Sequence, residues 1–467
     1  MPPIDSPARS SSAPRRSPRW VFVQLSIALA ALSIVGAWIT DNYWQEPSGA
    51  TYSFPVSDGW CDPPTQGIGL HCFGDFQLPL VFLDEPASVW ERSGSIGAPI
   101  SVTPTGMLPH VASKALIDSG LGPKLTLWLF LIVLALALLT PALVAIWQSR
   151  RGLGWLIPIL ILGVATQPVW NALDRGTTVG FTVPLLLVFA LTADRDPPWL
   201  APAAVILATS VRPQFILLAL AFIAFGRWRA FVSTIAAAVG VQLISFIVWP
   251  GNFTETTQAW FRNLSGYSTY GGLGPTEGSA NVSLAQAVAL AGRALGALPG
   301  WLGSAGSSLT EWAGAHASIP GIVLVVLVIV CFILARNQLP RVVALTIALA
   351  LPALVPGTVF SYYLTFVLVV GALILGPQAL RRESGLWRFE ATGGLDRLMS
   401  PAWIWWRWLL VAITAITLFP LPFRFLGGLN SGVMYLGGVT WSLVVGSALA
   451  VALTQQIREN VKDGAGN

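Results

Sequence analysis

The chain has 467 residues, of which 54% are hydrophobic and 10% are charged, and its formal net charge is +5. Soluble globular proteins carry roughly 25% charged residues, so this chain lacks the charge that a soluble protein needs to cover its surface. The composition therefore excludes a soluble protein and indicates an integral membrane protein. The basic pI of about 9.4 requires no nucleic-acid partner, because the basic residues follow the membrane topology described below.

Apolar blocks of about 15–25 residues, separated by polar gaps, have the length that a helix needs to cross roughly 30 Å of hydrocarbon. They predict an all-α integral membrane protein with about twelve transmembrane helices. The expected spans are residues 20–40, 125–147, 153–173, 178–193, 199–211, 214–226, 230–250, 320–335, 342–356, 358–377, 408–425 and 433–454. Arg212-Pro213 divides residues 199–226, which could instead form a hairpin that does not fully cross.

The distribution of basic residues predicts the orientation. With the N-terminus inside, most of the 26 Lys and Arg residues and a minority of the 21 Asp and Glu residues fall in cytoplasmic segments. We therefore expect a multi-pass protein of the plasma (inner) membrane with both termini in the cytoplasm. The first apolar block is too long for a cleaved signal peptide and is interpreted as a signal anchor.

The same pattern predicts the organisation of the chain around a membrane core with two long external loops. The segments are a disordered cytoplasmic tail (1–19), the core (20–377) with external loops 41–123 and 251–319, a cytoplasmic loop with a Trp-rich interfacial helix (378–407), a C-terminal transmembrane pair (408–454) and a cytoplasmic tail (455–467).

Two of the three cysteines, Cys61 and Cys72, lie in the first external loop, where an oxidising environment favours a disulfide. Together with His71 and Asp75 they could instead bind a metal, but the usual zinc spacings are absent, and we expect no metal site. Cys331 lies in an apolar span and is interpreted as a packing residue.

Two aspartates are candidates for a general base. Asp75 follows the Cys61–Cys72 segment in the sequence HCFGDF, and a carboxylate on a rigid loop at the membrane surface has the fixed geometry that proton abstraction requires. Asp41 directly follows the first helix and has a similar claim. Either aspartate could also be an ordinary solvated loop residue.

Arg175 and Arg212 stand at the external ends of short apolar segments, in LDRGTTVG and TSVRPQF. An arginine near hydrocarbon is costly and needs a partner, and both residues oppose the inside bias of the other basic residues. A phosphate group offers the bidentate partner that a guanidinium prefers. Snorkelling, or a local pair between Asp174 and Arg175, is the alternative.

The order of these motifs resembles the polyprenol-phosphate-sugar-dependent glycosyltransferases of family 87, members of the GT-C class. The resemblance runs through HCFGDF (71–76), SVTPTGMLPH (101–110), LDRGTTVGF (173–181), SVRPQF (210–215), SANVSLAQA (279–287) and VPGTVFSYYLTF (355–366). It covers roughly residues 70–370, most of the chain.

The resemblance implies a GT-C-like core, a lipid-linked sugar donor, and inverting transfer without a cofactor. Asp75 stands where the family has its catalytic aspartate, with Asp41 in reserve, and Arg212 stands where the family has a basic residue that binds the donor phosphate. The other residues that we expect at the donor or substrate site, all of them in the segments quoted above, are His110, Arg175, Gln214, Asn281, Tyr362 and Tyr363.

This sequence departs from the family pattern at three places. Thr177 and Thr178 replace a polar amide pair, Tyr362-Tyr363 stand where mannosyltransferases often have histidine, and the Cys61–Cys72 segment lengthens the first loop. The departures leave the sugar open between mannose and arabinofuranose. The Ala-, Gly-, Arg- and Trp-rich composition is typical of a high-GC actinobacterium, in which such enzymes build envelope glycans and lipoglycans.

The sequence therefore predicts a membrane glycosyltransferase that moves a sugar, with mannose favoured, from a polyprenyl phosphate to an envelope glycan or glycolipid. The expected partners are the lipid bilayer, this donor and the acceptor glycan. The alternative is a polytopic transporter or flippase for a lipid-linked precursor, although the spans are nearly uncharged and show no internal repeat. A third possibility is a non-catalytic envelope assembly protein.

The predicted orientation can be tested by thiol labelling in intact cells. Cys61 and Cys72 should resist a membrane-impermeant reagent until a reductant is added, because a disulfide protects both. A cysteine in place of Ser149, expected at the cytoplasmic face, should stay protected. Immediate labelling at position 149 would overturn the orientation.

Overall fold

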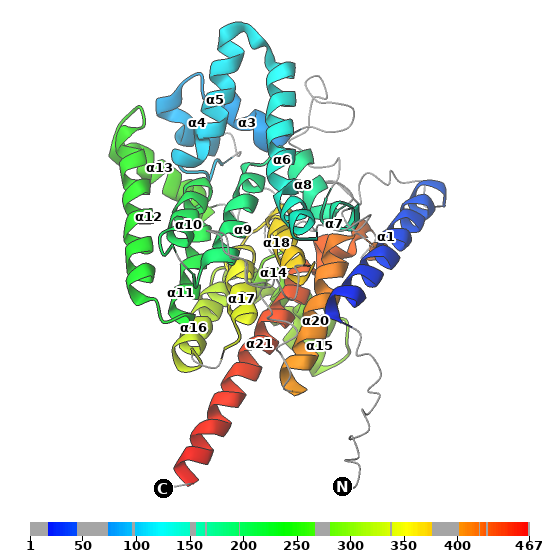
Figure 1. The fold of residues 1–467 in the computed structure, drawn as a ribbon. Helices are drawn as coiled ribbons and strands as arrows, with labels where there is room; N and C mark the ends of the chain where they lie inside the picture. Colours follow the sequence, from blue (N-terminus) through cyan, green and yellow to red (C-terminus); the bar gives the residue numbers. More distant parts are fainter. Residues whose placement is uncertain are drawn as a thin grey trace, which may run out of the picture.

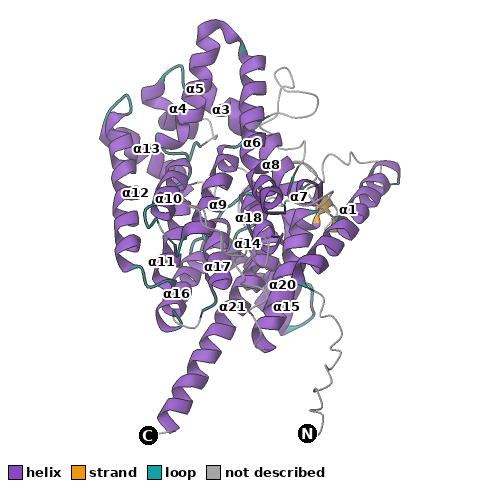
Figure 2. Ribbon diagram, in the orientation of Figure 1, coloured by secondary structure: helices purple, strands orange, loops and turns teal. Residues whose placement is uncertain are grey.

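The computed structural model describes residues 17–43, 73–95, 99–149, 156–163, 166–195, 197–266, 281–336, 339–375, 401–419, 421–425 and 428–465. This part of the chain is almost entirely helical (Figure 1 and Figure 2), so the expected helical class is confirmed. The exception is a small antiparallel hairpin of β1 (Pro422–Phe425) and β2 (Gly428–Ser431), in which Phe425 pairs with Gly428.

Within the described ranges, four helices are long and apolar enough to cross a membrane: α1 (Pro18–Asn42), α6 (Pro123–Ser149), α12 (Trp228–Val248) and α21 (Gly432–Ala465). Two bent pairs raise the number to six if each is one span. They are α7 (Leu156–Leu162) with α8 (Gln167–Arg175), bent by 58°, and α15 (Trp301–Ala315) with α16 (Ile319–Leu334), bent by 85°. The chain is therefore a membrane protein, but the expected count of twelve is not confirmed.

Most of the other expected spans are interrupted or short apolar helices. They are η5 (Thr178–Thr182) with α9 (Val183–Thr192), α10 (Leu200–Val211), η6 (Pro213–Ala219) with α11 (Leu220–Ala224), α17 (Arg341–Leu354), η8 (Ser361–Thr365) with α18 (Phe366–Leu375), and α20 (Pro401–Leu418). A 12-residue helix such as α10 is only about 18 Å long, less than the hydrocarbon thickness of roughly 30 Å.

Helices α17 and α18 lie at the centre of the molecule (Figure 1). Almost every side chain in them is buried. The outer helices instead present large apolar side chains, such as Val35 on α1 and Val248 on α12, to the surroundings. Apolar surface of this kind is stable against hydrocarbon and costly in water, as the membrane assignment requires.

The C-terminal pair differs from the sequence expectation. The boundary expected between residues 407 and 408 falls inside α20, and the expected span 408–425 ends at Leu418, before β1. Trp403 and Trp406, expected in an interfacial helix, are buried, and their indole N–H groups donate to the Gln455 side chain and the Val444 carbonyl. These bonds hold α20 on α21. Residues 378–400 lie outside the described ranges.

The two long connections of the sequence meet in a second core, which we name the loop unit. Its elements are α3 (Gly74–Phe82), η1 (Pro86–Ser88), α4 (Val89–Ser95), η2 (Thr105–Met107), α5 (Leu108–Leu116), η3 (Ile117–Leu121) and α13 (Phe253–Gly266). Its centre is Trp90, packed against Phe246 and Trp249. The buried Asn263 amide on α13 donates to the Trp90 and Ile100 carbonyls, so the second connection ties down the first.

The second connection continues as a close-packed helical hairpin of α14 (Leu284–Gly296) and α15. Gly292 and Gly306 make this approach possible. A methyl group on Gly306 would lie 2.2 Å from the Gly296 nitrogen and 2.5 Å from the Gly292 carbonyl oxygen. Any side chain there forces the helices apart. The hairpin joins the loop unit to α16.

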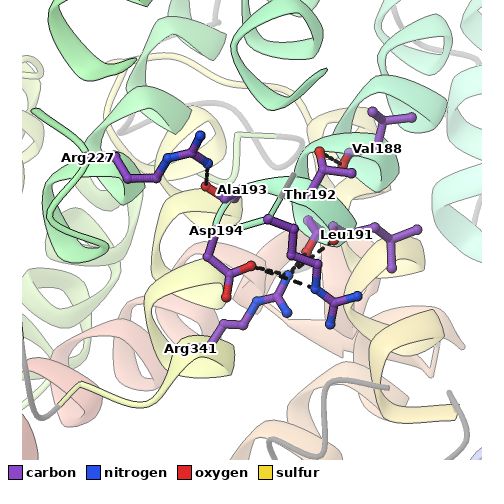
Figure 3. Close-up of polar contacts among 9 residues, drawn as sticks. Val188, Leu191, Thr192, Ala193, Asp194, Arg227 and Arg341 are labelled. Carbon is purple, nitrogen blue, oxygen red and sulfur yellow. Dashed lines mark hydrogen bonds and ion pairs between the residues drawn. The ribbon is translucent and has the colours of Figure 1, made fainter. Parts of the chain in front are cut away.

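Arginines lie at both ends of the antiparallel helices α9 and α10, most of them supplied by neighbouring helices. At the end where α9 stops and α10 starts, Arg227 donates to the Ala193 carbonyl at 2.6 Å, and Arg341 donates to the Ala190 and Leu191 carbonyls (Figure 3). Arg341 also pairs with Asp194 at 2.8 Å. These arginines satisfy carbonyls that a helix C-terminus leaves without partners. Arg175 and Arg212 mark the opposite end of the same hairpin.

Candidate functional site

Asp75 occupies the first turn of α3, and its carboxylate is held by an ion pair. Its Oδ1 lies 3.1 Å from Nη2 of Arg175, with side-chain exposures of 17% for Asp75 and 7% for Arg175. Its Oδ2 has no hydrogen-bond partner among the described residues. The positive end of the α3 dipole also favours a negative charge at this position. The site therefore holds one carboxylate oxygen and leaves the other available.

The backbone before Asp75 is strained. Phe73, the N-cap of α3, has a φ of 48°, and no other non-glycine residue in the described ranges has a positive φ. A bulky residue in this region costs free energy and persists only when its surroundings enforce it. The Phe73 and Phe76 side chains are both in the main hydrophobic core, and this packing fixes the direction in which α3 begins.

Arg175 reaches Asp75 because α8 ends against α3. Gly176 follows Arg175 with a φ of 61°, the left-handed conformation that terminates helices. A side chain at Gly176 would place its Cβ 2.8 Å from the Cβ of Phe76, so only glycine allows this approach. The close contact of α8 with α3 sets the separation of the ion pair.

His110 holds the backbone of Asp75 through a hydrogen bond. Its Nε2 lies 3.0 Å from the Asp75 carbonyl oxygen, and because a carbonyl only accepts, Nε2 carries the proton. The ring packs against Phe76 and Phe130. Burial lowers the pKa of His110 from 6.5 to about 4, so the imidazole is neutral at physiological pH. Nδ1 has no partner within the described ranges.

Arg212 ends α10 in an extended conformation, with φ −146° and ψ 126°. Pro213 is the cause, since a proline ring clashes with a helical residue before it. The side chain is 9% exposed, and its Nη1 donates to the Ser101 hydroxyl at 3.3 Å. Arg212 thus lies where an apolar helix ends at a proline, as its sequence motif indicates.

The carbonyls at the end of α10 are held by other elements. The Thr105 hydroxyl donates to the Ser210 carbonyl at 2.8 Å, and the Gln242 amide on α12 donates to the Thr209 carbonyl at 2.9 Å. Helix C-termini leave such carbonyls unpaired unless other groups bind them. The segment SVTPTGMLPH therefore fixes both Arg212, through Ser101 and Thr105, and Asp75, through His110.

Tyr363 lies near both Arg212 and the Asp75–Arg175 ion pair. It lies on η8, where its ring stacks on Tyr362 at 5.3 Å and packs near Phe215 at 6.0 Å. Its hydroxyl is hydrogen-bonded to the side chain of Gln214, and the charges of Arg212 and Asp75 both act on it. The same two charges act on His110. The structure therefore brings together the predicted residues Asp75, His110, Arg175, Arg212, Gln214, Tyr362 and Tyr363.

Asn281 joins two backbone segments. Its Oδ1 accepts from the backbone N–H groups of Ser283 and Val359, and its Nδ2 donates to the Gly357 carbonyl. Asn281 also forms a bridge with Phe360, next to η8. These bonds position the chain that carries Tyr362 and Tyr363. A direct role of Asn281 toward the substrate stays a prediction.

Sequence reasoning missed two polar residues beside this cluster, Asn171 and Ser361. The amide of Asn171 on α8 donates to the Ser361 hydroxyl at 3.1 Å, and both side chains are buried. The available signal was the spacing of Gln167, Asn171 and Arg175, which puts three polar side chains on one face of an apolar helix.

The remaining predicted residues have different outcomes. Asp41 lies in the last turn of α1, which packs on α18 and α20. Cys61 and Cys72 lie outside the described residues. Thr177 and Thr178 are fully buried, and their hydroxyls have no partner in the described part of the chain. Within the same ranges, no group of three His, Cys, Asp or Glu residues could hold a metal ion.

The arrangement combines two chemical capabilities at one end of a broken helical core. Two largely buried guanidinium groups offer planar, bidentate donors of the kind that bind phosphate. Asp75 supplies a carboxylate with one oxygen unoccupied within the described ranges, which can accept a proton. A neutral histidine and a tyrosine surround them. This is a polar, charged site, built where apolar helices end.

The fold and this site define a polytopic helical membrane protein with an enzyme-like polar centre. A model of glycosyltransferase family 87 matches residues 102–361, more than half of the chain. The chain therefore belongs to glycosyltransferase family 87 and is a glycosyltransferase, as its motifs predicted. The match includes His110, Arg175, Arg212 and Asn281, whereas Asp75 precedes it. No curated protein and no solved structure matches the chain.

The buried neutral state of His110 predicts acid sensitivity. The folded protein keeps His110 neutral down to about pH 4, whereas the unfolded chain protonates it below about pH 6.5. Its contribution to stability is therefore complete above pH 6.5 and is lost as the pH falls toward 4, by about 3 kcal/mol in total. His110→Gln keeps a side-chain N–H donor but does not titrate.

Thermal unfolding of both proteins in detergent, measured between pH 7.5 and pH 5, checks this expectation. The Tm of the wild type should fall relative to that of His110→Gln as the pH decreases. Replacement of the exposed His316 by Gln is the matched control and should produce no such trend. A Tm difference between wild type and His110→Gln that is constant across the range contradicts the assignment.

Proposed function

We propose that this glycosyltransferase moves a sugar, mannose or arabinofuranose with mannose favoured, from a polyprenyl-phosphate donor to an envelope glycan or glycolipid. The transfer inverts the anomeric configuration and takes place on the external face of the plasma membrane. The observation that carries the proposal is the Asp75–Arg175 pair at 3.1 Å, with Arg212 and His110 beside it.

The residues of the site have distinct roles in this reaction. The guanidinium of Arg212, at the end of α10, binds the donor phosphate, and Arg175, which pairs with Asp75, is the second residue assigned to the phosphate. The acceptor hydroxyl approaches the opposite face of the sugar and gives its proton to Oδ2 of Asp75. Its oxygen forms a bond to the anomeric carbon as the bond from that carbon to the phosphate oxygen breaks, and polyprenyl phosphate leaves.

No general acid is needed for this step, because the phosphate leaves as a stable anion that the arginines stabilise. For the same reason we propose that the transfer needs no metal ion or organic cofactor. Lipid-linked donors explain why the site lies where apolar helices end, since the polyprenyl chain is anchored in hydrocarbon and its phosphate at the membrane surface.

The proposed topology is the one predicted from charge. About twelve hydrophobic segments place both termini in the cytoplasm and the loop unit outside. Support comes from the paired helices α9 and α10. Arg227 and Arg341, from the starts of α12 and α17, bind the end where α9 stops, and Arg212 ends α10 at the other end. The second end is then external, together with Asp75.

The first test concerns the base. Asp75→Asn retains the size of the side chain and most of its hydrogen bonding but cannot accept a proton. We expect this variant to bind donor normally and to transfer sugar at least roughly 100-fold more slowly. Asp41→Asn is the matched comparison and should be much milder. Transfer is measured with purified protein, polyprenyl-phosphate mannose and a lipid-linked acceptor.

Two outcomes would change the assignment of the base. An inactive Asp41→Asn protein together with an active Asp75→Asn protein would move the base to Asp41. Full activity in both variants would reject the mechanism.

The second test concerns the donor phosphate. Arg212→Lys keeps the charge but not the planar fork, and Arg212→Ala removes both, so donor affinity should fall in the order wild type, Lys, Ala. The effect should appear mainly in the KM for the donor. Arg229→Ala, an exposed arginine at the start of α12, is the control and should leave this KM unchanged. A wild-type donor KM in Arg212→Ala would remove Arg212 from the phosphate site.

A further inference from the structure

The pair formed by Asn171 and Ser361 has unused hydrogen-bonding capacity in a buried place. Asn171 is 1% exposed and Ser361 is fully buried. The Asn171 Nδ2 group donates to the Ser361 hydroxyl oxygen at 3.1 Å, but Oδ1 of Asn171 has no partner within the described ranges. A buried amide oxygen without a hydrogen bond costs free energy, so this atom requires a donor that the described protein does not supply.

The position of the pair relates it to the candidate site. Asn171 precedes Arg175 by four residues on α8, so the two side chains share one helix face, about 6 Å apart along the axis. Ser361 precedes Tyr363 by two residues on η8, and Tyr363 lies within the influence of both Asp75 and Arg212. The pair therefore lies one helical turn beyond the Asp75–Arg175 ion pair, and on η8 it adjoins Tyr363 near Arg212.

The chemistry of the pair matches one ligand group. Asn171 Oδ1 is an acceptor, and the Ser361 hydroxyl, whose oxygen already accepts from Asn171, still has its proton to donate. A hydroxyl group needs one acceptor and one donor, and it finds both here. A phosphate oxygen would face the unpaired amide oxygen unfavourably, and an apolar group would leave both atoms unsatisfied.

We propose that Asn171 and Ser361 form a subsite that binds one hydroxyl of the transferred sugar and thereby selects the donor. The proposal rests on the proposed function, because it takes the sugar to lie beside a phosphate held by Arg212. The sugar then extends from the Asp75–Arg175 pair along α8, with its anomeric carbon toward Asp75 and one hydroxyl on the pair. Asn171 and Ser361 discriminate between sugars, whereas Asp75 carries out proton transfer.

The experiment compares the full donor with analogues that each lack one hydroxyl. The probes are short-chain polyprenyl-phosphate mannose, the corresponding arabinofuranose donor, and the mono-deoxy forms of whichever sugar the wild type transfers. The wild type should use one deoxy analogue at least about tenfold less efficiently than the full donor. The missing hydroxyl leaves Asn171 and Ser361 without their hydrogen-bond partner. Asn171→Ala and Ser361→Ala should lose at least about tenfold in kcat/KM with the full donor.

The decisive result is the effect of the variants on that same analogue. Both variants should abolish the penalty for the missing hydroxyl and keep the penalties for the others, since only one contact is removed. Binding of polyprenyl phosphate without a sugar should equal that of the wild type in both variants, which also shows that they fold. Thr414→Ala removes a buried hydroxyl that donates to the Leu410 carbonyl of the same helix, α20; it is the matched control and should change none of these values.

Other outcomes separate this proposal from the proposed function. Variants that slow every donor by the same factor, or that keep the wild-type analogue profile, overturn the subsite and leave the proposed function intact. In those cases the Asn171–Ser361 bond only ties α8 to η8 or holds a water molecule. Failure of the wild type to transfer sugar from either donor overturns the proposed function, and the subsite with it.

Discussion

The ion pair between Asp75 and Arg175 is the constraint around which the other elements of the site are arranged. Two charges that are 17% and 7% exposed lose much of their hydration, and only close pairing and further hydrogen bonds offset that loss. The pair forms because Gly176 lets α8 end against Phe76 and because Phe73 accepts a strained φ before α3. His110 then fixes the Asp75 peptide. The carboxylate is thereby held in place before any substrate arrives, as efficient proton transfer requires.

Broken helices make such a polar site possible inside an apolar protein. A continuous helix uses all of its interior backbone groups and presents only side chains, whereas an interrupted helix ends inside the molecule and changes direction there. Here α8 ends at Gly176, α10 ends before Pro213, and η8 precedes α18. Each break delivers one or more polar side chains to the same place. The same breaks explain why four helices of the described part of the chain, or up to six with the bent pairs, have the full length of a span.

The sequence predicts the membrane class, the family and most of the site cluster. These features depend on hydrophobic blocks and on local motifs in a fixed order, and both can be recognised without the structure. Arg212 is recognisable from its proline and its location between apolar blocks.

The environments of residues inside helices are harder to predict from the sequence. Trp403 and Trp406 resemble an interfacial belt but are buried on α21, and nothing local distinguishes the two environments. Asn171 and Ser361 are 190 positions apart, so their contact depends on how α8 and η8 pack. Hydropathy alone does not settle the number of spans, because short apolar helices and full spans have the same composition.

The arginines of the α9–α10 hairpin show how structural and functional positive charges can be separated in such a protein. Arg227 and Arg341 direct their guanidinium groups at backbone carbonyls of the neighbouring helix end, which are permanent partners that no ligand replaces. Arg175 pairs with the Asp75 carboxylate and Arg212 donates to the Ser101 hydroxyl, which are side-chain groups that can rearrange around a ligand. A basic residue at a helix end is therefore ambiguous in sequence, because the same residue type serves both positions. In the proposed reaction the substrate binds at the end of the α9–α10 hairpin that lies toward Asp75, and Arg227 and Arg341 hold the other end in register.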